Sequence, residues 1–468
     1  MDKKQRKQHF TGRLVMLGFG CIGRGVLPLL QRHIDLPAER ILIISPNPAE
    51  QTLARQLGLP VLACGLTPDD YRQKLTAELQ RGDFLLNLSV SVATHALIQL
   101  CHQLGVLYLD TCIGPWSGGY DDPALSISAR SNYALRETTL GLRNRLGPGP
   151  TAIVNHGANP GLVSHLLKQA LLDLARPALV PATREEWARL AHGLGVRCIQ
   201  IAERDTQLSG TAKAMGEFVN TWSVPGFISE AAQPAEMGWG SHERAMPDDA
   251  RRHEFGSQAA IYLQRPGGTT RVYGWTPLSG PQQGFLITHG EAISIADYLT
   301  IGDPLAPDYR PTVFYAYHPC DDAVLSLHEL VGRHWQPQER QRLLLDDLLG
   351  GVDALGVLLM GQEGDAYWYG SQLSVEQARA LCPRNSATSL QVTASVMAGV
   401  VWAMRNPDRG IVEPDEIPFE PILELCRPYL GDLGGTFTDW TPLQGRRALF
   451  PEDLDYDDPW QFRNFRVL

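Results

Sequence analysis

A glycine-rich turn near the N-terminus, between an apolar run and an amphipathic stretch, constrains the fold of this chain more than any other feature. Residues 13–34 read RLVMLGFGCIGRGVLPLLQRHI, and Gly18, Gly20 and Gly23 form the pattern G-x-G-x-x-G. The first glycine suits a tight turn, the second lets the backbone approach a pyrophosphate, and the third allows close packing of a helix on a strand. The N-terminus of that helix offers free N–H groups and a positive dipole end to phosphates. The pattern predicts a dinucleotide-binding strand, turn and helix.

Further cofactor contacts are expected from the turn itself and from positions near the ends of later strands. In full, the predicted cofactor-binding residues are Gly18, Gly20, Cys21, Ile22, Gly23, Ser45, Ser89 and Thr111. Dinucleotide domains often carry an acidic residue at the end of strand two for the ribose hydroxyls. Here the strand ends in Ser45-Pro46-Asn47, which has neither that acid nor an arginine for a 2'-phosphate. The sequence therefore leaves NAD and NADP as open alternatives.

Apolar runs alternate with helical stretches through residues 1–155. Near-continuous apolar strands that alternate with helices are typical of a parallel sheet covered on both faces. We therefore predict an α/β fold whose N-terminal part is a Rossmann-type doubly wound parallel sheet. After the first strand, the predicted strands are 41–45, 61–66, 83–90, 106–113 and a candidate sixth at 151–157, and the predicted helices are 48–58, 69–82 and 92–105.

The alternation stops after the run NHGANPGLVSH at residues 155–165. Helical stretches mixed with short β-like runs, such as RCIQIAE, AAIYLQ and GFLITHG, predict a second, α+β domain over 156–380. We expect this domain to bind the substrate and to carry the dimer contacts. A small-residue apolar stretch at about 386–405 predicts a buried helix that returns to the nucleotide domain, and 406–468 is expected to be an irregular wrapping segment.

Composition narrows the class of partner. The chain has 468 residues, 44% hydrophobic and 20% charged, which describes an ordinary folded protein, and its net charge is −10. This negative net charge disfavours nucleic acid as a binding partner and permits a basic small molecule as a substrate. A basic start before the apolar turn resembles a signal peptide, but cleavage there would remove the glycine turn, and no apolar run reaches the ~20 residues of a membrane helix. We expect no membrane association.

The chain contains eight cysteines, none of them in a C-x-x-C pair. No Cys/His cluster has zinc-ligand spacing along the sequence, so no metal site is predicted. Scattered thiols of this kind suggest a reducing cytoplasm.

An acidic and aromatic segment, WSVPGFISEAAQPAEMGWGSHE at 222–243, has no lysine or arginine. Carboxylates complement the charge of an alkyl ammonium, and a ring face attracts it by up to about 2 kcal/mol when water is excluded. The segment therefore predicts a site for a small organic cation. The competing interpretation is that the tryptophans belong to the core and the acids to the solvated surface.

The chain resembles bacterial homospermidine synthases, within the wider saccharopine dehydrogenase-like group. The motifs that carry the resemblance span nearly the whole chain: VMLGFGCIGRG, DTCIGPWSGGY, NHGANPGLVSH, IAERDTQ, NTWSVPGFISEAAQPAEMGWGSHE, LITHGEA, DALGVLLMG and AYWYGSQLS. The resemblance implies a homodimeric cytoplasmic enzyme that holds NAD and joins two putrescines into homospermidine with loss of ammonia. NAD would take a hydride from one diamine and return it to the new imine, and so act as a catalyst.

The resemblance also implies roles for single residues. Trp222 matches a cation-stacking tryptophan, Glu203 and Glu230 match acids that line the amine pocket, and Asp353 matches an outer amine position. From its own chemistry, His289 could shuttle a proton, because an ordinary histidine titrates in the useful range, or bind an amine, or be a satisfied core histidine.

Other candidates have weaker support. Asn159 could bind the amine or the nicotinamide, or could simply hold a turn. Glu236 and Glu243 are candidate pocket acids that could equally be solvated. Lys213 could form a Schiff base, but no apolar pocket surrounds it in the sequence, so we expect a solvated lysine. Gly114 departs from the family pattern, in which a glutamate helps to hold the amine.

Two alternatives remain at this point. A saccharopine- or carboxyspermidine-type dehydrogenase would need arginines for substrate carboxylates, and the segment 222–243 has none before Arg244. A non-catalytic sensor could keep the NAD fold and bind polyamine or a protein without turnover.

Overall fold

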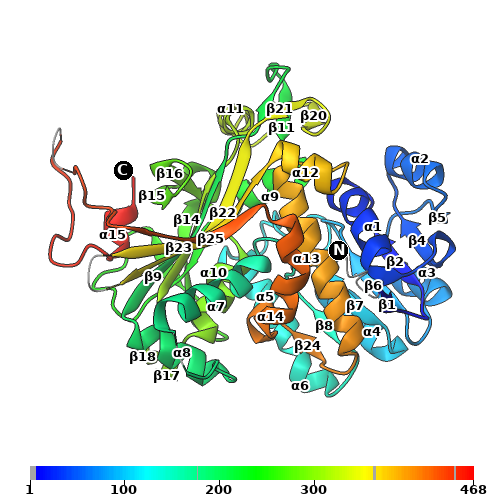
Figure 1. Cartoon of the computed structure of the whole chain (residues 1–468), viewed down its shortest axis with the longest axis horizontal. Helices are drawn as coiled ribbons and strands as arrows, with labels where there is room; N and C mark the ends of the chain where they lie inside the picture. The colour runs from blue at the N-terminus through cyan, green and yellow to red at the C-terminus, as the bar shows by residue number, and fades with distance from the viewer. Residues whose placement is uncertain (1–6, 177, 362–364, 447–449, 468) are drawn as a thin grey trace, which may run out of the picture.

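The computed structural model describes residues 7–176, 178–361, 365–446 and 450–467, and it contains two large sheets (Figure 1). The first is a seven-stranded sheet in which every neighbouring pair is parallel. Its order across the sheet is β24 (Ile411–Val412), β8 (Ala152–Ile153), β7 (Leu107–Asp110), β6 (Phe84–Asn87), β2 (Leu14–Leu17), β4 (Ile41–Ile44) and β5 (Val61–Leu62).

Helices cover both faces of this sheet. Leu14 and Met16 of β2 belong to one core cluster, whereas Val15 and Leu17 belong to another, because successive side chains of a strand point to opposite faces. The helices between the strands are α1 (Cys21–His33), α2 (Pro48–Gln56), α3 (Tyr71–Glu78) and α4 (Thr94–Leu104). The predicted doubly wound parallel sheet is confirmed, and the candidate sixth strand exists as the short β8.

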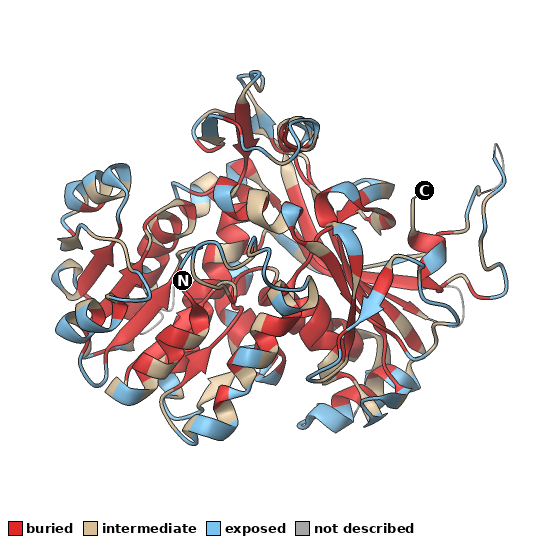
Figure 2. Cartoon of the chain, turned by 180° about the vertical axis from the view of Figure 1, so that it is seen from behind, coloured by how far each residue is buried: buried red, intermediate tan, exposed pale blue. Residues whose placement is uncertain are grey.

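The second sheet is mixed and has ten strands. Its central strand, β9 (Val196–Asp205), runs parallel to β19 and antiparallel to β22. The order is β13 (Ala250–Arg252), β14 (Ala260–Pro266), β12 (Pro234–Gly238), β19 (Thr312–His318), β9, β22 (Val352–Gly361), β23 (Ala366–Ser374) and β25 (Asp432–Thr438). A hairpin of β15 (Arg271–Thr276) and β16 (Gly280–Leu286) joins it, since β16 also pairs with β19. Figure 2 shows the strands of both sheets as largely buried.

One long helix apart, the remaining helices have 4 to 14 residues. The other helices are α5 (Asn132–Leu140), α6 (Leu142–Leu146), α7 (Leu162–Ala175), α8 (Arg184–Gly193), α9 (Val224–Ala232), α10 (Gly290–Tyr298), α11 (Asp321–Gly332), α12 (Val375–Leu381), α14 (Phe419–Cys426) and α15 (Phe462–Phe465). Small two-stranded sheets pair β1 (Gln8–His9) with β3 (Ile34–Asp35), β10 (Leu208–Ser209) with β21 (Leu348–Gly350), β11 (Glu217–Asn220) with β20 (Arg340–Leu343), and β17 (Ile301–Asp303) with β18 (Ala306–Tyr309).

The long helix α13 (Ala387–Arg405) returns to the nucleotide sheet as predicted. It packs on α1 and on β7, and Ser386 caps its N-terminus. By length and composition it is the one helix among the described residues that could cross a membrane, but 89% of its apolar window is buried inside the protein. Its apolar character is therefore that of a core helix.

The expectation that residues 406–468 are irregular is wrong for several stretches besides the short α15. Residues 411–412 form β24 at the edge of the first sheet, 419–426 form α14, and 432–438 form β25 at the edge of the second sheet. Strands of this kind take their hydrogen bonds from neighbours far away in sequence, so local pattern does not reveal them. The domain boundaries at 155/156, 380 and 406 stay a prediction.

Candidate functional site

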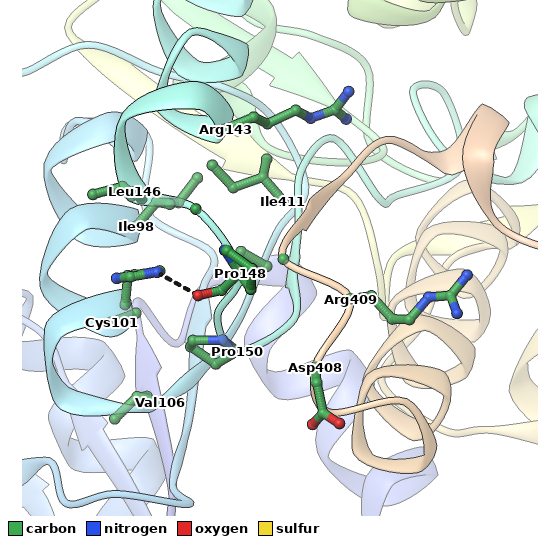
Figure 3. A pocket seen from close by; sticks show the side chains of 14 residues that line it. Ile98, Cys101, Val106, Arg143, Leu146, Pro148, Pro150, Asp408, Arg409 and Ile411 are labelled. Atoms are coloured by element: carbon green, nitrogen blue, oxygen red, sulfur yellow. Dashed lines mark hydrogen bonds between the residues drawn. The ribbon is translucent and has the colours of Figure 1, made fainter.

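Two pockets lie at opposite edges of the seven-stranded sheet. One is bordered by the segments that lead into β7, β8 and β24, among them Val106, Pro150 and Gly410. Figure 3 shows it between α4 and the 408–411 segment, with Arg143 and Arg409 at its rim. The other contains Thr111 and Cys112, which follow β7, and so lies at the carboxyl ends of the strands. Ligands of doubly wound folds bind at the carboxyl ends, which makes the second pocket the candidate site.

The glycine turn has the geometry that a pyrophosphate cradle needs. Gly18 has φ of +82°, which glycine adopts at little cost. A Cβ on Gly23 would lie 2.9 Å from the Gly18 carbonyl oxygen, so only glycine lets α1 pack this closely. Gly20 caps the helix, and Ile22 in its first turn lines the pocket. The fit between this turn and a bound dinucleotide is therefore good.

The remaining predicted cofactor residues lie along the same edge. Cys21 is buried at the start of α1, Ser45 directly follows β4, Ser89 lies two residues beyond β6, and Thr111 lines the pocket after β7. The Ser89 amide and hydroxyl both donate to Asn87 Oδ1, at 3.2 and 2.7 Å. That these residues contact a cofactor stays a prediction.

Sequence reasoning missed a carboxylate at this turn. Glu50, in the first turn of α2, accepts a hydrogen bond of 2.8 Å from the Phe19 amide and one of 2.6 Å from the Ser45 hydroxyl. Its other oxygen would lie 3.2 Å from a Cβ placed on Gly20. A carboxylate thus lies beside the glycine turn, supplied by the helix that follows strand two and not by the strand end itself. An acidic residue in the first turn of that helix was the available signal.

Five of the six predicted catalytic residues line the second pocket: Asn159, Glu203, Trp222, Glu230 and His289. They come from separate parts of the second domain, which the sheet and α9 bring to the carboxyl edge of the first. The described residues that line this pocket include no lysine or arginine. The pocket therefore supplies carboxylates and aromatic rings without a lysine or arginine side chain beside them.

Glu203 is buried on β9 with neutral partners. It accepts hydrogen bonds from the Tyr315 hydroxyl at 2.5 Å and from the Asn159 amide at 3.1 Å. Burial raises the pKa of Glu203 to about 7, the neighbouring Asp205 adds to the rise, and the Tyr315 and Asn159 hydrogen bonds oppose it. A carboxylate with a pKa near neutrality can accept a proton from an ammonium and give it back.

His289 lies between two carboxylates. Its Nε2 is 3.2 Å from Glu230 Oε2, and its Nδ1 is 3.2 Å from Glu291 Oε1. Although burial lowers its pKa, the charges of Glu291 and Glu230 outweigh burial and raise the pKa of His289 to about 10. The ordinary titration range assumed from the sequence therefore does not apply, since this histidine holds its proton at neutral pH. One imidazolium between two carboxylates leaves the group with a net negative charge.

Trp222 is half-buried and lines the pocket while also packing on the core. Its Nε1 donates to the Tyr317 hydroxyl at 3.0 Å, and its ring lies 5.7 Å from that of Phe227. The hydrogen bond fixes the indole, because an indole N–H has only one donor direction. Trp222 thus both packs on the core and lines the pocket, and its contact with a cation stays a prediction.

Asp353, the sixth predicted catalytic residue, lies behind the pocket wall. It is buried on β22, opposite Asp205 of β9, and accepts a 2.5 Å hydrogen bond from Thr388, which does line the pocket. Burial and the nearby Glu203 and Asp205 carboxylates hold the pKa of Asp353 well above its usual range. Its contact with an amine stays a prediction.

Three weaker candidates lie elsewhere. Glu236 accepts from the Asn132 and Tyr133 amides and so holds the start of α5. Glu243 is bonded to the C-terminal segment through the Phe462 amide. Lys213 forms an ion pair with Glu329 of α11, so the expectation that this lysine is solvated is wrong. None of the three is among the described residues of the pocket.

Two further contributors were not predicted. Tyr315 and Asp205 were missed, although each lies two residues from another site residue on the same face of its strand. Tyr315 shares a face with Tyr317 on β19, and Asp205 shares a face with Glu203 on β9. A search for polar residues on one strand face would have found them.

Gly114, the departure from the family pattern, lines the pocket. A Cβ built on it would meet no atom within 4 Å, and its φ is not in the left-handed region. Its amide donates to the Thr94 hydroxyl at 3.1 Å. A larger side chain would therefore project into open space at this position.

Comparison with known proteins agrees with this arrangement. The saccharopine dehydrogenase NADP binding domain family matches residues 14–153, and the saccharopine dehydrogenase C-terminal domain family matches residues 157–438. The homospermidine synthase of Blastochloris viridis is 51% identical over 464 residues, which cover 97% of both proteins. The chain belongs to the homospermidine synthase family.

Two other homospermidine synthases extend the comparison. The homospermidine synthase of Mesorhizobium japonicum is 49% identical over 98% of this chain and 96% of its own length. The crystal structure of the Legionella pneumophila homospermidine synthase, solved in complex with NAD, superposes with a TM-score of 0.92 at 44% identity and covers both chains completely. The family's fold is thus present from end to end.

Proposed function

We propose that this chain is an NAD-dependent homospermidine synthase that joins two putrescines and releases ammonia. The observation that carries the proposal is the 51% identity to a homospermidine synthase over 97% of both chains. The pocket supports it, because rings and carboxylates without a lysine or arginine suit a diammonium substrate. Putrescine as the preferred amine, a homodimer and a cytoplasmic location are parts of the same proposal.

The cofactor is NAD. The turn of Gly18, Gly20 and Gly23 would hold its pyrophosphate, and Glu50 would face the adenosine ribose. A carboxylate at that place favours ribose hydroxyls and repels a 2'-phosphate. When bound, NAD takes a hydride from the carbon next to one amine of the first diamine and later returns it to the new imine.

The side chains of the pocket handle protons and charge. An amine must be neutral before a hydride leaves the adjacent carbon, and Glu203 is the proposed acceptor of that proton because its pKa is about 7. The second amine attacks the imine carbon and ammonia leaves. Glu230 with protonated His289 would hold the distal ammonium, and the face of Trp222 would stabilise the cationic imine.

The alternatives fit less well. A saccharopine-type substrate carries carboxylates that call for arginine, and the described pocket residues include none. A sensor without turnover would give no reason for a buried carboxyl poised near neutral pH. The test is incubation of the purified protein with putrescine and catalytic NAD. Homospermidine and ammonia in equal amounts support the proposal, and NAD binding without any product supports the sensor.

A further inference from the structure

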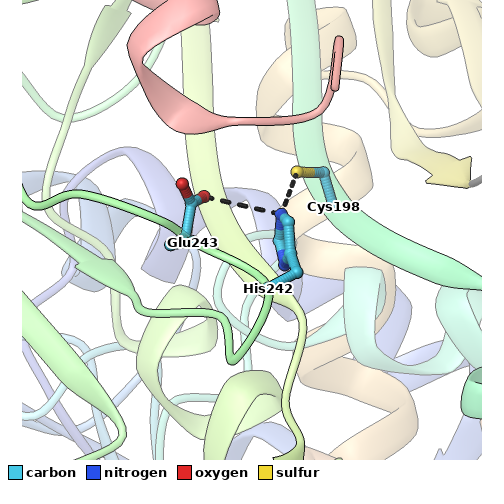
Figure 4. Close-up of side chains that lie close together, drawn as sticks. All are labelled: Cys198, His242 and Glu243. Atoms are coloured by element: carbon cyan, nitrogen blue, oxygen red, sulfur yellow. Dashed lines mark hydrogen bonds and ion pairs between the residues drawn. The ribbon is translucent and has the colours of Figure 1, made fainter. Parts of the chain in front are cut away.

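A cluster of side chains that suits a metal lies outside the pocket, where the C-terminal segment meets the second sheet. Cys198 on β9 and the adjacent His242 and Glu243 bring one sulfur, one ring nitrogen and one carboxylate oxygen within 4.8 Å of one another. Figure 4 shows the imidazole of His242 pointing at both the thiol and the carboxylate. The first two residues are 44 positions apart, so their spacing along the sequence showed no metal motif.

The separations are those of ligands that share an ion. Cys198 Sγ lies 3.7 Å from His242 Nε2, and this nitrogen lies 3.6 Å from Glu243 Oε1, too far for a good hydrogen bond. Bonds of about 2.0–2.3 Å to a tetrahedral zinc place neighbouring ligand atoms about 3.3–3.7 Å apart. Both distances therefore match those between ligands of a common ion.

A backbone oxygen lies beside two of the three side chains. The carbonyl oxygen of Trp460 lies 3.0 Å from both the Cys198 sulfur and the His242 nitrogen. The thiol and the ring nitrogen thus both lie at contact distance from this one oxygen. Together the three side chains and this carbonyl offer one sulfur, one nitrogen and two oxygens.

The charge of the cluster also calls for a cation. The side chain of Glu243 is 1% exposed, and among the described residues its hydrogen-bond donors are the Thr312 hydroxyl and the Phe462 amide. No described lysine or arginine forms an ion pair with it. Buried carboxylates are normally paired or bound to metal, and a thiolate with a carboxylate would neutralise a divalent ion.

We infer that Cys198, His242, Glu243 and the Trp460 carbonyl form a structural zinc site that fastens the C-terminal segment to the second sheet. Thiolate and imidazole ligands select zinc over magnesium or calcium, which prefer oxygen alone. With the Trp460 carbonyl as its fourth ligand the site has no open position, as structural zinc sites do. The fastened segment carries Trp460, Phe462 and Phe465, which complete the core cluster on that face of the sheet.

Metal content tests the inference independently of catalysis. The full chain, purified from cells grown with added zinc and then desalted, should contain about one zinc per chain. Replacement of zinc by Co²⁺ should produce a thiolate-to-cobalt charge-transfer band and the visible absorption of tetrahedral cobalt. Chelation by EDTA should lower the apparent Tm, and added zinc should restore it.

Variants locate the ion. Cys198→Ser and His242→Gln should each lose the zinc, and Cys198→Ser should also lose the cobalt–thiolate band. Cys101→Ser is the matched control, because Cys101 is an equally buried free thiol on α4 outside the cluster, and it should keep both. The inference is overturned if the wild type, grown with zinc, holds far less than one ion per chain and shows no cobalt–thiolate band. This measurement does not depend on the folding of any variant. It is equally overturned if Cys198→Ser retains the zinc.

Discussion

The hydroxyl of Tyr315 should set the pH at which the enzyme becomes active. It donates a 2.5 Å hydrogen bond to Glu203, and this bond lowers the pKa of that carboxyl against the larger effect of burial, which leaves the pKa at about 7. Glu203 accepts a proton only when it is ionised, so kcat/KM for putrescine should rise with pH through about 7. Tyr315→Phe removes the donor, destabilises the ionised form and moves the rise to higher pH.

The size of the shift follows from the hydrogen bond. A hydrogen bond to a charged group contributes about 1.5–3 kcal/mol, and one pKa unit corresponds to about 1.4 kcal/mol. The midpoint should therefore move by about 1–2 units, to about pH 8–9. At pH 7 the ionised fraction falls from about one half to between about one tenth and one hundredth, a loss of about 5- to 50-fold in kcat/KM. Activity should recover as the pH rises.

The assay is the pH profile of kcat/KM, which reports the free enzyme. The amines of putrescine titrate identically for both enzymes, so the difference between the profiles isolates the protein. Tyr317→Phe is the matched control: its ring stacks on Tyr315 at 5.4 Å, but its hydroxyl contacts Trp222. This variant should lose activity at every pH while its midpoint stays near 7. A Tyr315→Phe profile whose midpoint is unmoved, or moved to lower pH, would refute Glu203 as the titrating group.

Three further substitutions test other parts of the site. Trp222→Phe should retain partial activity, whereas Trp222→Ala should lose about 30-fold or more in kcat/KM, the equivalent of about 2 kcal/mol of cation–π attraction. If circular dichroism shows that Trp222→Ala is unfolded, the ring serves mainly the core. Gly114→Glu should raise turnover on putrescine with unchanged NAD affinity, by about 150-fold if the added carboxylate recovers about 3 kcal/mol. A decrease would show that the pocket is organised around other acids. Glu50→Gln should weaken the preference for NAD over NADP in binding titrations by about tenfold or more, since it removes a charge that repels the 2'-phosphate; an unchanged ratio would exclude Glu50 as the discriminating group.

The sequence predicted the nucleotide domain well because its signals are local. The turn at Gly18, Gly20 and Gly23 depends on adjacent residues, and each buried parallel strand is a short apolar run. The strand Ile411–Val412 could not be predicted in this way. It is two residues long and pairs with Ala152–Ile153, from which it is separated by the entire second domain.

The sequence predicted which residues form the candidate site better than it predicted their protonation states and partners. Glu203, Trp222 and Glu230 were correctly expected to lie near one another, because their motifs match those of the family, and the composition of segment 222–243 also pointed to Trp222 and Glu230. The state of His289 was not predictable, since it depends on two carboxylates, one of them 59 residues away. Glu243 was misplaced for a similar reason: its partners lie on the C-terminal segment, and composition does not tell a pocket acid from one that fastens two segments together.

The most direct test of the central claim is the balance between product and cofactor. The wild-type protein is incubated with excess putrescine and a small, known amount of NAD, and homospermidine, ammonia and free NADH are measured over time. Homospermidine and ammonia should form in equal amounts, exceed the added NAD many-fold and leave no net NADH in solution. Release of NADH in proportion to product would contradict the account, because it would mark an ordinary dehydrogenase that does not return the hydride.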